Sequence, residues 1–180
     1  MAAAASELPD PPAIARRRRL YRPAQVEVLL VGESAPAGGT HFYRANSNLF
    51  RAVRAAFTRV YGARLPDGEE FLGFLRAHRY WLVDLADEPV NHLDRRLRRA
   101  AVQHGIPRLA RTIRATKPGV IVVVLKSIEP SATAALRLSG CDAELVAPPF
   151  PTMGWGRDFD AGLARVVRRR RAPGAARRLS

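Results

Sequence analysis

The sequence predicts an α/β fold: a three-layer α/β/α domain in which helices cover both faces of a four-stranded, mostly parallel sheet. Short apolar runs alternate along the chain with segments of helical spacing, which is the pattern of repeated strand–helix units. The run VIVVVL at 120–125 is apolar on both faces, as expected of a central parallel strand. Strand–helix units in this order pack with right-handed crossovers and form a parallel sheet.

The first unit organises the rest of the chain. Residues 26–31 are a short apolar run and predict a buried strand. A loop at 32–46 follows, and an amphipathic helix is predicted over 47–61 with Ser47 as its N-cap and Gly62 at its end. The loop is much longer than the usual connection of about 2–6 residues. Because ligands of parallel sheets bind outside the carboxyl ends of the strands, we expect this loop to border a site.

The remaining elements follow from the same reasoning. Asn91 is a candidate N-cap for the third helix, and Pro107 can occupy the first turn of the next. The predicted strands are 80–85, 120–125 and 143–147, and the further predicted helices are 69–78, 92–104, 108–116, 130–138 and a last one from 157 or 158 to about 169.

Charge divides the 180 residues into one domain and two tails. The net charge is +14, of which residues 1–22 carry +3 (five Arg against Glu7 and Asp10) and residues 165–180 carry +7 (seven Arg, no acid). We expect a disordered basic tail at 1–22, a single domain at 23–168 and a disordered, Arg-rich tail at 169–180. Arg-rich tails attract phosphate without reading sequence, but a merely solvated role is equally open.

Several classes of site are missing from the sequence. No apolar run approaches the roughly 20 residues of a membrane span and no signal peptide is recognisable, so we expect a cytoplasmic protein. Cys141 is the only cysteine, and the four histidines lack metal-site spacing, so no metal is expected. Gly39-Thr40 stands where a phosphate-binding loop needs Gly-Lys-Ser/Thr, and no GxGxxG or GxSxG motif occurs. We expect a monomer without a cofactor.

The loop sequences resemble the uracil-DNA glycosylase superfamily. Residues 32–36 read GESAP, which is similar to the GEAPG motif of the family's iron–sulfur branch with one residue more before the proline. Residues 41–49 read HFYRANSNL, which is similar to that branch's PFxGxxGxxL pattern with one residue fewer between Phe42 and Leu49. The order of later elements is also similar, so the resemblance covers about residues 26–168.

The resemblance implies roles for five residues. Glu33 would be the catalytic residue, orienting the water that attacks the sugar carbon, although it could instead hold its loop shut through backbone hydrogen bonds. Phe42 would stack on a flipped base, or else be a core aromatic beneath the loop. Asp84 stands where the family usually has the Asn that reads uracil, and could instead cap the next loop. Ser34 and Phe150 complete the expected base-binding set.

The last loop of the domain, 148–156, would contact DNA. Met153 and Trp155, together with Phe150, are candidates for a wedge that fills the space left by a flipped base, and Arg157 is a candidate for a phosphate contact. The family's final motif contains a His that stabilises the departing base, and this loop has none. The carboxylate of Asp84 also lacks the N–H donor that uracil O4 needs, which argues against plain uracil as substrate.

These departures leave three functions open. The first is a uracil-DNA glycosylase-like protein that binds DNA and excises a deaminated or damaged base by N-glycosidic hydrolysis, in base excision repair. The second is a non-catalytic module of the same fold that binds nucleic acid or a nucleotide. The third is an unrelated flavodoxin-like domain whose first loop holds a nucleotide phosphate.

Overall fold

The computed structural model describes residues 11–148 and 156–171. In chain order the helices and strands are α1 Pro11–Leu20, β1 Val28–Gly32, the 3₁₀ turn η1 Phe42–Arg44, α2 Asn48–Tyr61, α3 Gly68–Ala77, β2 Tyr80–Asp84, α4 Arg95–His104, α5 Ile106–Thr116, β3 Val120–Val123, the 3₁₀ turn η2 Lys126–Ile128, α6 Glu129–Ser139, β4 Glu144–Val146 and α7 Gly156–Arg171. The chain thus folds as repeated strand–helix units, and the four strands lie within two residues of their predicted ends.

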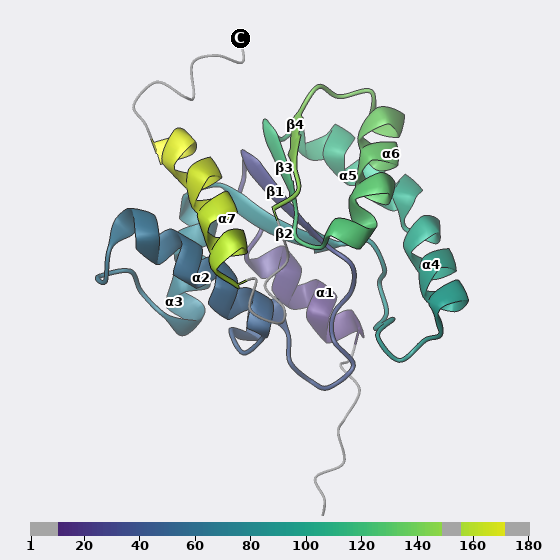
Figure 1. Cartoon of the computed structure of the whole chain (residues 1–180), viewed down its shortest axis with the longest axis horizontal. Coiled ribbons are helices and arrows are strands. Elements are labelled where there is room, and N and C mark those ends of the chain that lie inside the picture. The colour runs from purple at the N-terminus through teal and green to yellow at the C-terminus, as the bar shows by residue number, and fades with distance from the viewer. Residues whose placement is uncertain (1–10, 149–155, 172–180) are drawn as a thin grey trace, which may run out of the picture.

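The four strands form one parallel sheet in the order β2-β1-β3-β4. Helices α2 and α7 pack together on one face, and α5 and α6 pack together on the other, as Figure 1 shows on either side of the strands. The predicted α/β class and three-layer arrangement are therefore confirmed. All pairings are parallel, where the sequence predicts a mostly parallel sheet.

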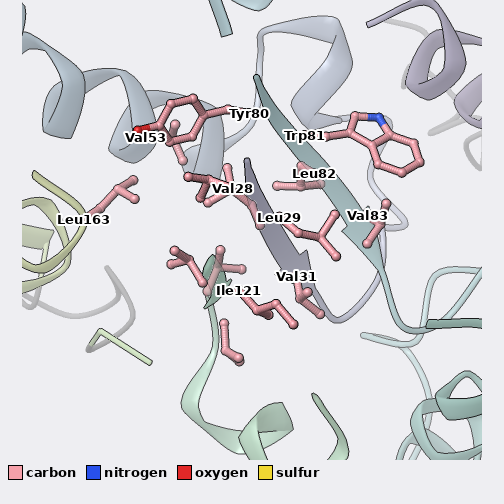
Figure 2. Packing of buried hydrophobic residues seen from close by; sticks show 14 of the residues in the cluster. Val28, Leu29, Val31, Val53, Tyr80, Trp81, Leu82, Val83, Ile121 and Leu163 are labelled. Atoms are coloured by element: carbon pink, nitrogen blue, oxygen red, sulfur yellow. The ribbon is translucent and has the colours of Figure 1, made fainter. Parts of the chain in front are cut away.

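The core lies on both faces of the two central strands. Every residue of β1 and β3 is buried, which explains why their sequences are continuous apolar runs rather than alternating ones. Edge strand β2 is also fully buried, and Figure 2 shows Tyr80 and Trp81 on opposite sides of it. Edge strand β4 is partly exposed, and its sequence is correspondingly short and polar at Glu144.

The topology creates a crevice at the carboxyl ends of β1 and β3. The chain leaves β1 toward α2 on one face, and it leaves β3 toward α6 on the other face. Neighbouring strands whose connections depart in opposite directions leave a gap between the two loops, which is the usual place for a ligand in such sheets. The loop that begins at Gly32 borders this gap.

The predicted disordered tail at 1–22 is wrong for residues 11–22. Pro11 and Pro12 sit in the first turn of α1, where proline is tolerated, and Ile14 is buried against the domain. The Arg run is not simply solvated, because Arg17 and Arg18 each find acceptors on other elements. Residues 1–10 lie outside the described residues.

Two other boundaries differ from the prediction. Helix α7 continues to Arg171, so the first three residues of the expected 169–180 tail are helical, and 172–180 lie outside the described residues. Helix α4 begins at Arg95 with Asp94 as its N-cap, because the Asp94 carboxylate accepts from Leu97 N–H. The expected cap, Asn91, instead accepts from Ala37 N–H at 3.1 Å and ties the two loops together. Within the described residues, no helix is long and apolar enough to cross a membrane.

Candidate functional site

A cavity of about 640 Å³ opens at the carboxyl edge of the sheet. It is bordered by the loop after β1, the start of α2, the ends of β2 and β3 and one side chain of α4; its polar lining includes Glu33, Ser34, Thr40, Ser47, Asn48, Arg51, Asp84, Asn91 and Arg98. Apolar lining comes from Phe42, Leu49, Leu82 and Val124, among others. The volume falls within the range of about 300–1,000 Å³ that is usual for small-molecule sites.

The loop after β1 is fixed by hydrogen bonds to the loop after β2. Leu85 N–H donates to the Gly32 carbonyl at 2.9 Å, and Ala86 N–H donates to the Glu33 carbonyl at 2.7 Å. Ser34 Oγ accepts from Val90 N–H at 3.2 Å. The two loops therefore hold each other in place, and the cavity between them has a preformed wall.

Glu33 points its carboxylate at a guanidinium from the next helix. Arg98 of α4 donates from Nε to Oε1 at 2.8 Å and from its second terminal nitrogen to Oε2, which makes a two-pronged ion pair. The Glu33 side chain is only 13% exposed. The hydrogen bond to Glu33 raises the pKa of Arg98, since the pair favours the charged guanidinium. The arrangement keeps a negative charge beside the cavity in one orientation.

Asp84 is held by a guanidinium from the N-terminal helix. Arg18 of α1 donates to Asp84 Oδ2 at 2.7 Å, and the two side chains are 12% and 7% exposed. Trp81 fixes the turn of α1 that carries Arg18, because its indole N–H donates to the Arg18 carbonyl at 3.1 Å. Arg22 lies over the Trp81 ring at 5.1 Å from its centroid. Helix α1 therefore forms part of the site on the side of Asp84.

The glycine at the end of β1 is required by the Asp84 carboxylate. The strand register pairs Gly32 with Asp84, and a Cβ at position 32 would lie 2.4 Å from Asp84 Oδ1. A side chain at this position would therefore displace the carboxylate from the cavity wall. Here the glycine serves close approach, since its backbone conformation needs no left-handed φ.

Two opposing effects act on the protonation of Asp84. Burial raises the pKa of its carboxyl, because the charged form loses its water. The positive charges of Arg18 and Arg108 lower it, and the nearby charge of Asp87 raises it slightly. Burial prevails, so the pKa of Asp84 lies above its ordinary value of 3.8.

Phe42 lines the cavity and also belongs to the aromatic core beneath the loop. Its ring lines the cavity, yet it is only 4% exposed. It packs edge-on against Tyr43 at 5.3 Å and Phe50 at 5.9 Å between ring centroids, and Phe50 continues into the core through Phe71. The ring is therefore a rigid part of the cavity wall that the aromatic core holds from behind.

Tyr43 covers the edge of β2 at Leu82, and His41 caps the turn that carries Tyr43. The Tyr43 hydroxyl donates to the Leu82 carbonyl at 2.8 Å and accepts from Leu82 N–H at 2.9 Å, so it satisfies both free backbone groups of an edge residue. His41 caps η1 by accepting from Tyr43 N–H at its Nδ1. Burial, together with the charges of Arg18, Arg44 and Arg17, lowers the pKa of His41 to about 4.

The structure brings four of the predicted site residues together. Glu33, Ser34, Phe42 and Asp84 all line the one cavity, as their positions at strand ends and in the first loop predict. The three aromatic and sulfur-containing candidates of the last loop, Phe150, Met153 and Trp155, lie outside the described residues. Of Arg157, the structure describes only its place in the first turn of α7.

Sequence reasoning missed the two arginines that pair with the carboxylates. Arg18 belongs to a charge run that the sequence assigns to a disordered tail, although Ile14 at helical spacing on the same segment is a signal of a buried face. Arg98 belongs to a helix with four arginines, and nothing in that pattern singles out one of them.

The chemistry available to the site is hydrogen bonding and charge. Within residues 11–148 and 156–171, no three His, Cys, Asp or Glu side chains are grouped so that they could hold a metal ion. The cavity presents two carboxylates, two amides, two guanidinium groups, hydroxyls and an aromatic wall. Neither a family model nor a curated protein matches this sequence.

Proposed function

We propose that this protein is a uracil-DNA glycosylase-like domain that binds nucleic acid and takes a single base into the cavity at the carboxyl edge of the sheet. The observation that carries the proposal is the meeting of Glu33, Phe42 and Asp84 in one cavity of about 640 Å³. The resemblance assigns the water to Glu33 of GESAP, the stacking surface to Phe42 of HFYRANSNL, and the base edge to Asp84 at the end of the second strand. A base must leave its stack to reach such a pocket.

The surroundings of the cavity suit a phosphate backbone. Arg51 lines the cavity from α2 and is exposed. On α4, next to the Glu33–Arg98 pair, Arg95, Arg96 and Arg99 are exposed, and Figure 1 shows this helix as the outermost one on its side of the sheet. Exposed arginines at this edge would position the strand through phosphate contacts, while the cavity would read the base.

Binding is tested with oligonucleotides that differ at one position. Each member of a panel carries one unpaired or modified base, and its partner carries an abasic-site analogue there. Fluorescence anisotropy of the full chain should show tighter binding of at least one base-containing oligonucleotide than of its abasic partner. Stacking on an aromatic ring alone contributes roughly 1–3 kcal/mol per base. Equal affinities across the whole panel would refute entry of a base into the cavity.

A second candidate function is excision of that base, and the Glu33–Arg98 pair favours it. Arg98 binds both oxygens of Glu33 and fixes a negative charge on the cavity wall, where it would orient a water and stabilise positive charge developing on the sugar. The measurement is abasic-site formation across the same panel. Glu33→Gln should slow it by about 10²–10⁴-fold while binding changes little. If the parent releases no base, the non-catalytic binding module remains.

A further inference from the structure

The two carboxylate oxygens of Asp84 have different surroundings. Oδ2 accepts from Arg18 at 2.7 Å. Oδ1 lies against the backbone of Gly32, where a Cβ would be only 2.4 Å away, and the Asp84 side chain lines the cavity. Within the described residues, no group makes a hydrogen bond to Oδ1. Oδ2 is thus occupied by Arg18, whereas Oδ1 can accept a hydrogen bond from a ligand that enters the cavity.

The charges around Asp84 come from several elements. Arg18 reaches it from α1, and Arg108 of α5 donates to its backbone carbonyl at 3.1 Å. Asp87 lies on the loop that follows β2, and Glu33 lines the same cavity. Of these groups, Arg18 is the one that touches the carboxylate itself. It opposes the effect of burial, which by itself favours the protonated acid.

We propose that Arg18 holds Asp84 as an ionised acceptor, and that Oδ1 selects a base that presents an amino donor over one that presents a carbonyl oxygen at the same position. The inference deepens the proposed function and rests on it. It assigns the ligand class as amino-bearing bases, and it makes Arg18 a positioning residue of the base-reading site.

The chemistry of the bases supports this selection. A carboxylate offers acceptors only. Cytosine presents an N4 amino donor, adenine an N6 amino donor and guanine an N2 amino donor, whereas the corresponding oxo group of uracil is an acceptor that a carboxylate repels. A protonated Asp84 would reverse the preference, because its O–H would donate to a carbonyl oxygen. The charge state that Arg18 sets is therefore the specificity switch.

The test compares cytosine with uracil, which differ in one amino group. Two otherwise identical single-stranded oligonucleotides, and a third with an abasic analogue, are titrated with the full chain at pH 8. The cytosine oligonucleotide should bind about tenfold or more tightly than the uracil one, as expected for a hydrogen bond to a charged group. Asp84→Asn should remove the preference for cytosine, because the amide supplies the donor that uracil O4 needs.

Arg18 is tested with a matched control on the same helix. Arg18→Met removes the cation that favours the ionised form of Asp84, so it should weaken the preference for cytosine, and this weakening should lessen as pH rises. Arg18→Lys should keep the preference. Arg19→Met removes the same charge from an exposed neighbour and should leave the ratio unchanged. If Arg18→Met does not fold, as judged by its melting curve, Asp84→Asn and Arg18→Lys still carry the test.

The three oligonucleotides distinguish base entry from base selection by Asp84. If neither base binds better than the abasic oligonucleotide, base entry itself is refuted. If both bases bind better than the abasic one but equally well, only the selection by Asp84 is refuted. A parent ratio that survives Asp84→Asn also overturns the selection, because another group must then read the amino nitrogen.

Discussion

The two ends of the sheet differ in the sign and the burial of their charged side chains. At the carboxyl edge, the carboxylates of Glu33 and Asp84 are 13% and 7% exposed, and each is held by one arginine. At the amino edge, a hollow of about 390 Å³ is lined by four cations, Arg22, Arg79, Lys117 and Arg170, and by the single acid Glu27. There Arg79 and Glu27 form an ion pair whose side chains are 47% and 30% exposed.

This difference separates a site with fixed geometry from a charged surface. Buried and paired charges lie in a low dielectric, so their positions are held strongly and their loss is costly. Exposed cations keep their water and attract any anion, with an effect that salt screens. The carboxyl edge is thus suited to selecting a ligand, and the amino edge only to attracting phosphate without selection.

The largest expected difference is between the free energies of unfolding lost when the Arg18–Asp84 pair and the Arg79–Glu27 pair are broken. Arg18→Met leaves Asp84 buried without its partner and should lower the free energy of unfolding by about 3–5 kcal/mol at pH 7. Arg79→Met breaks an exposed pair and should cost at most about 1 kcal/mol. The loss in Arg18→Met should shrink as pH falls and Asp84 takes up a proton. Urea unfolding at several pH values measures both, and equal losses would contradict the contrast.

His41 gives the carboxyl edge a pH dependence of its own. Its folded pKa of about 4 lies below the ordinary 6.5, so its stabilisation is fully present above pH 6.5 and is lost as pH falls from 6.5 to about 4. The total loss is about 3 kcal/mol, at 1.36 kcal/mol per unit of pKa shift. The pKa of Asp84 is raised, so Asp84 changes stability with pH in the opposite direction. The contribution of His41 is therefore isolated by comparing the parent with His41→Asn. The variant should lack this loss over the interval, and parallel curves would contradict the prediction.

Two glycines of the first loop provide a matched pair. Gly32→Ala forces a Cβ onto Asp84 Oδ1 and should cost about 1–3 kcal/mol, as overpacking does, and should reduce binding of base-containing oligonucleotides. Gly38→Ala meets nothing within 4 Å and should change stability by at most about 0.5 kcal/mol. Denaturant unfolding of the two variants tests the close approach directly. Equal stabilities would show that the loop adjusts freely.

The smallest expected effect is a change in oligonucleotide affinity when cations are removed from the amino edge. Arg79→Gln and Lys117→Gln together remove two exposed cations from the hollow. Affinity for any oligonucleotide should fall slightly, and the slope of log affinity against log salt should become shallower by about 1–2 if both cations contact phosphates. The ratio between base-containing and abasic partners should not change. A changed ratio would mean that the amino edge takes part in reading the base.

The sequence predicts the fold well because three of the four strands, β1, β2 and β3, are buried on both faces. Apolar runs such as 120–125 leave little choice of element, and strand ends then bring Glu33 and Asp84 to one edge. Ser47 is confirmed as the cap of α2, since its Oγ accepts from Phe50 N–H. In each of these cases local chemistry and tertiary structure agree.

The parts that could not be predicted depend on long side chains that reach across the fold. Arg18 lies 66 residues from Asp84, and Arg98 lies 65 residues from Glu33. A run of arginines is usually solvated, so only the packing of α1 on Trp81 and Tyr43 turns one of them into a partner for a buried acid. Asn91 is a similar case, because a loop contact with Ala37 displaces its expected capping role.

The central claim is that a base enters the carboxyl-edge cavity, and backbone amide NMR tests it most directly. Spectra of the full chain are recorded with the cytosine oligonucleotide and with its abasic partner, both at saturation. The difference between the two bound spectra should concentrate at 32–35, Asn91 and 124–125, around the cavity. Residues 115–119 at the amino edge should show the same shifts with either oligonucleotide. Differences centred on the amino edge, or no differences at all, would contradict the claim.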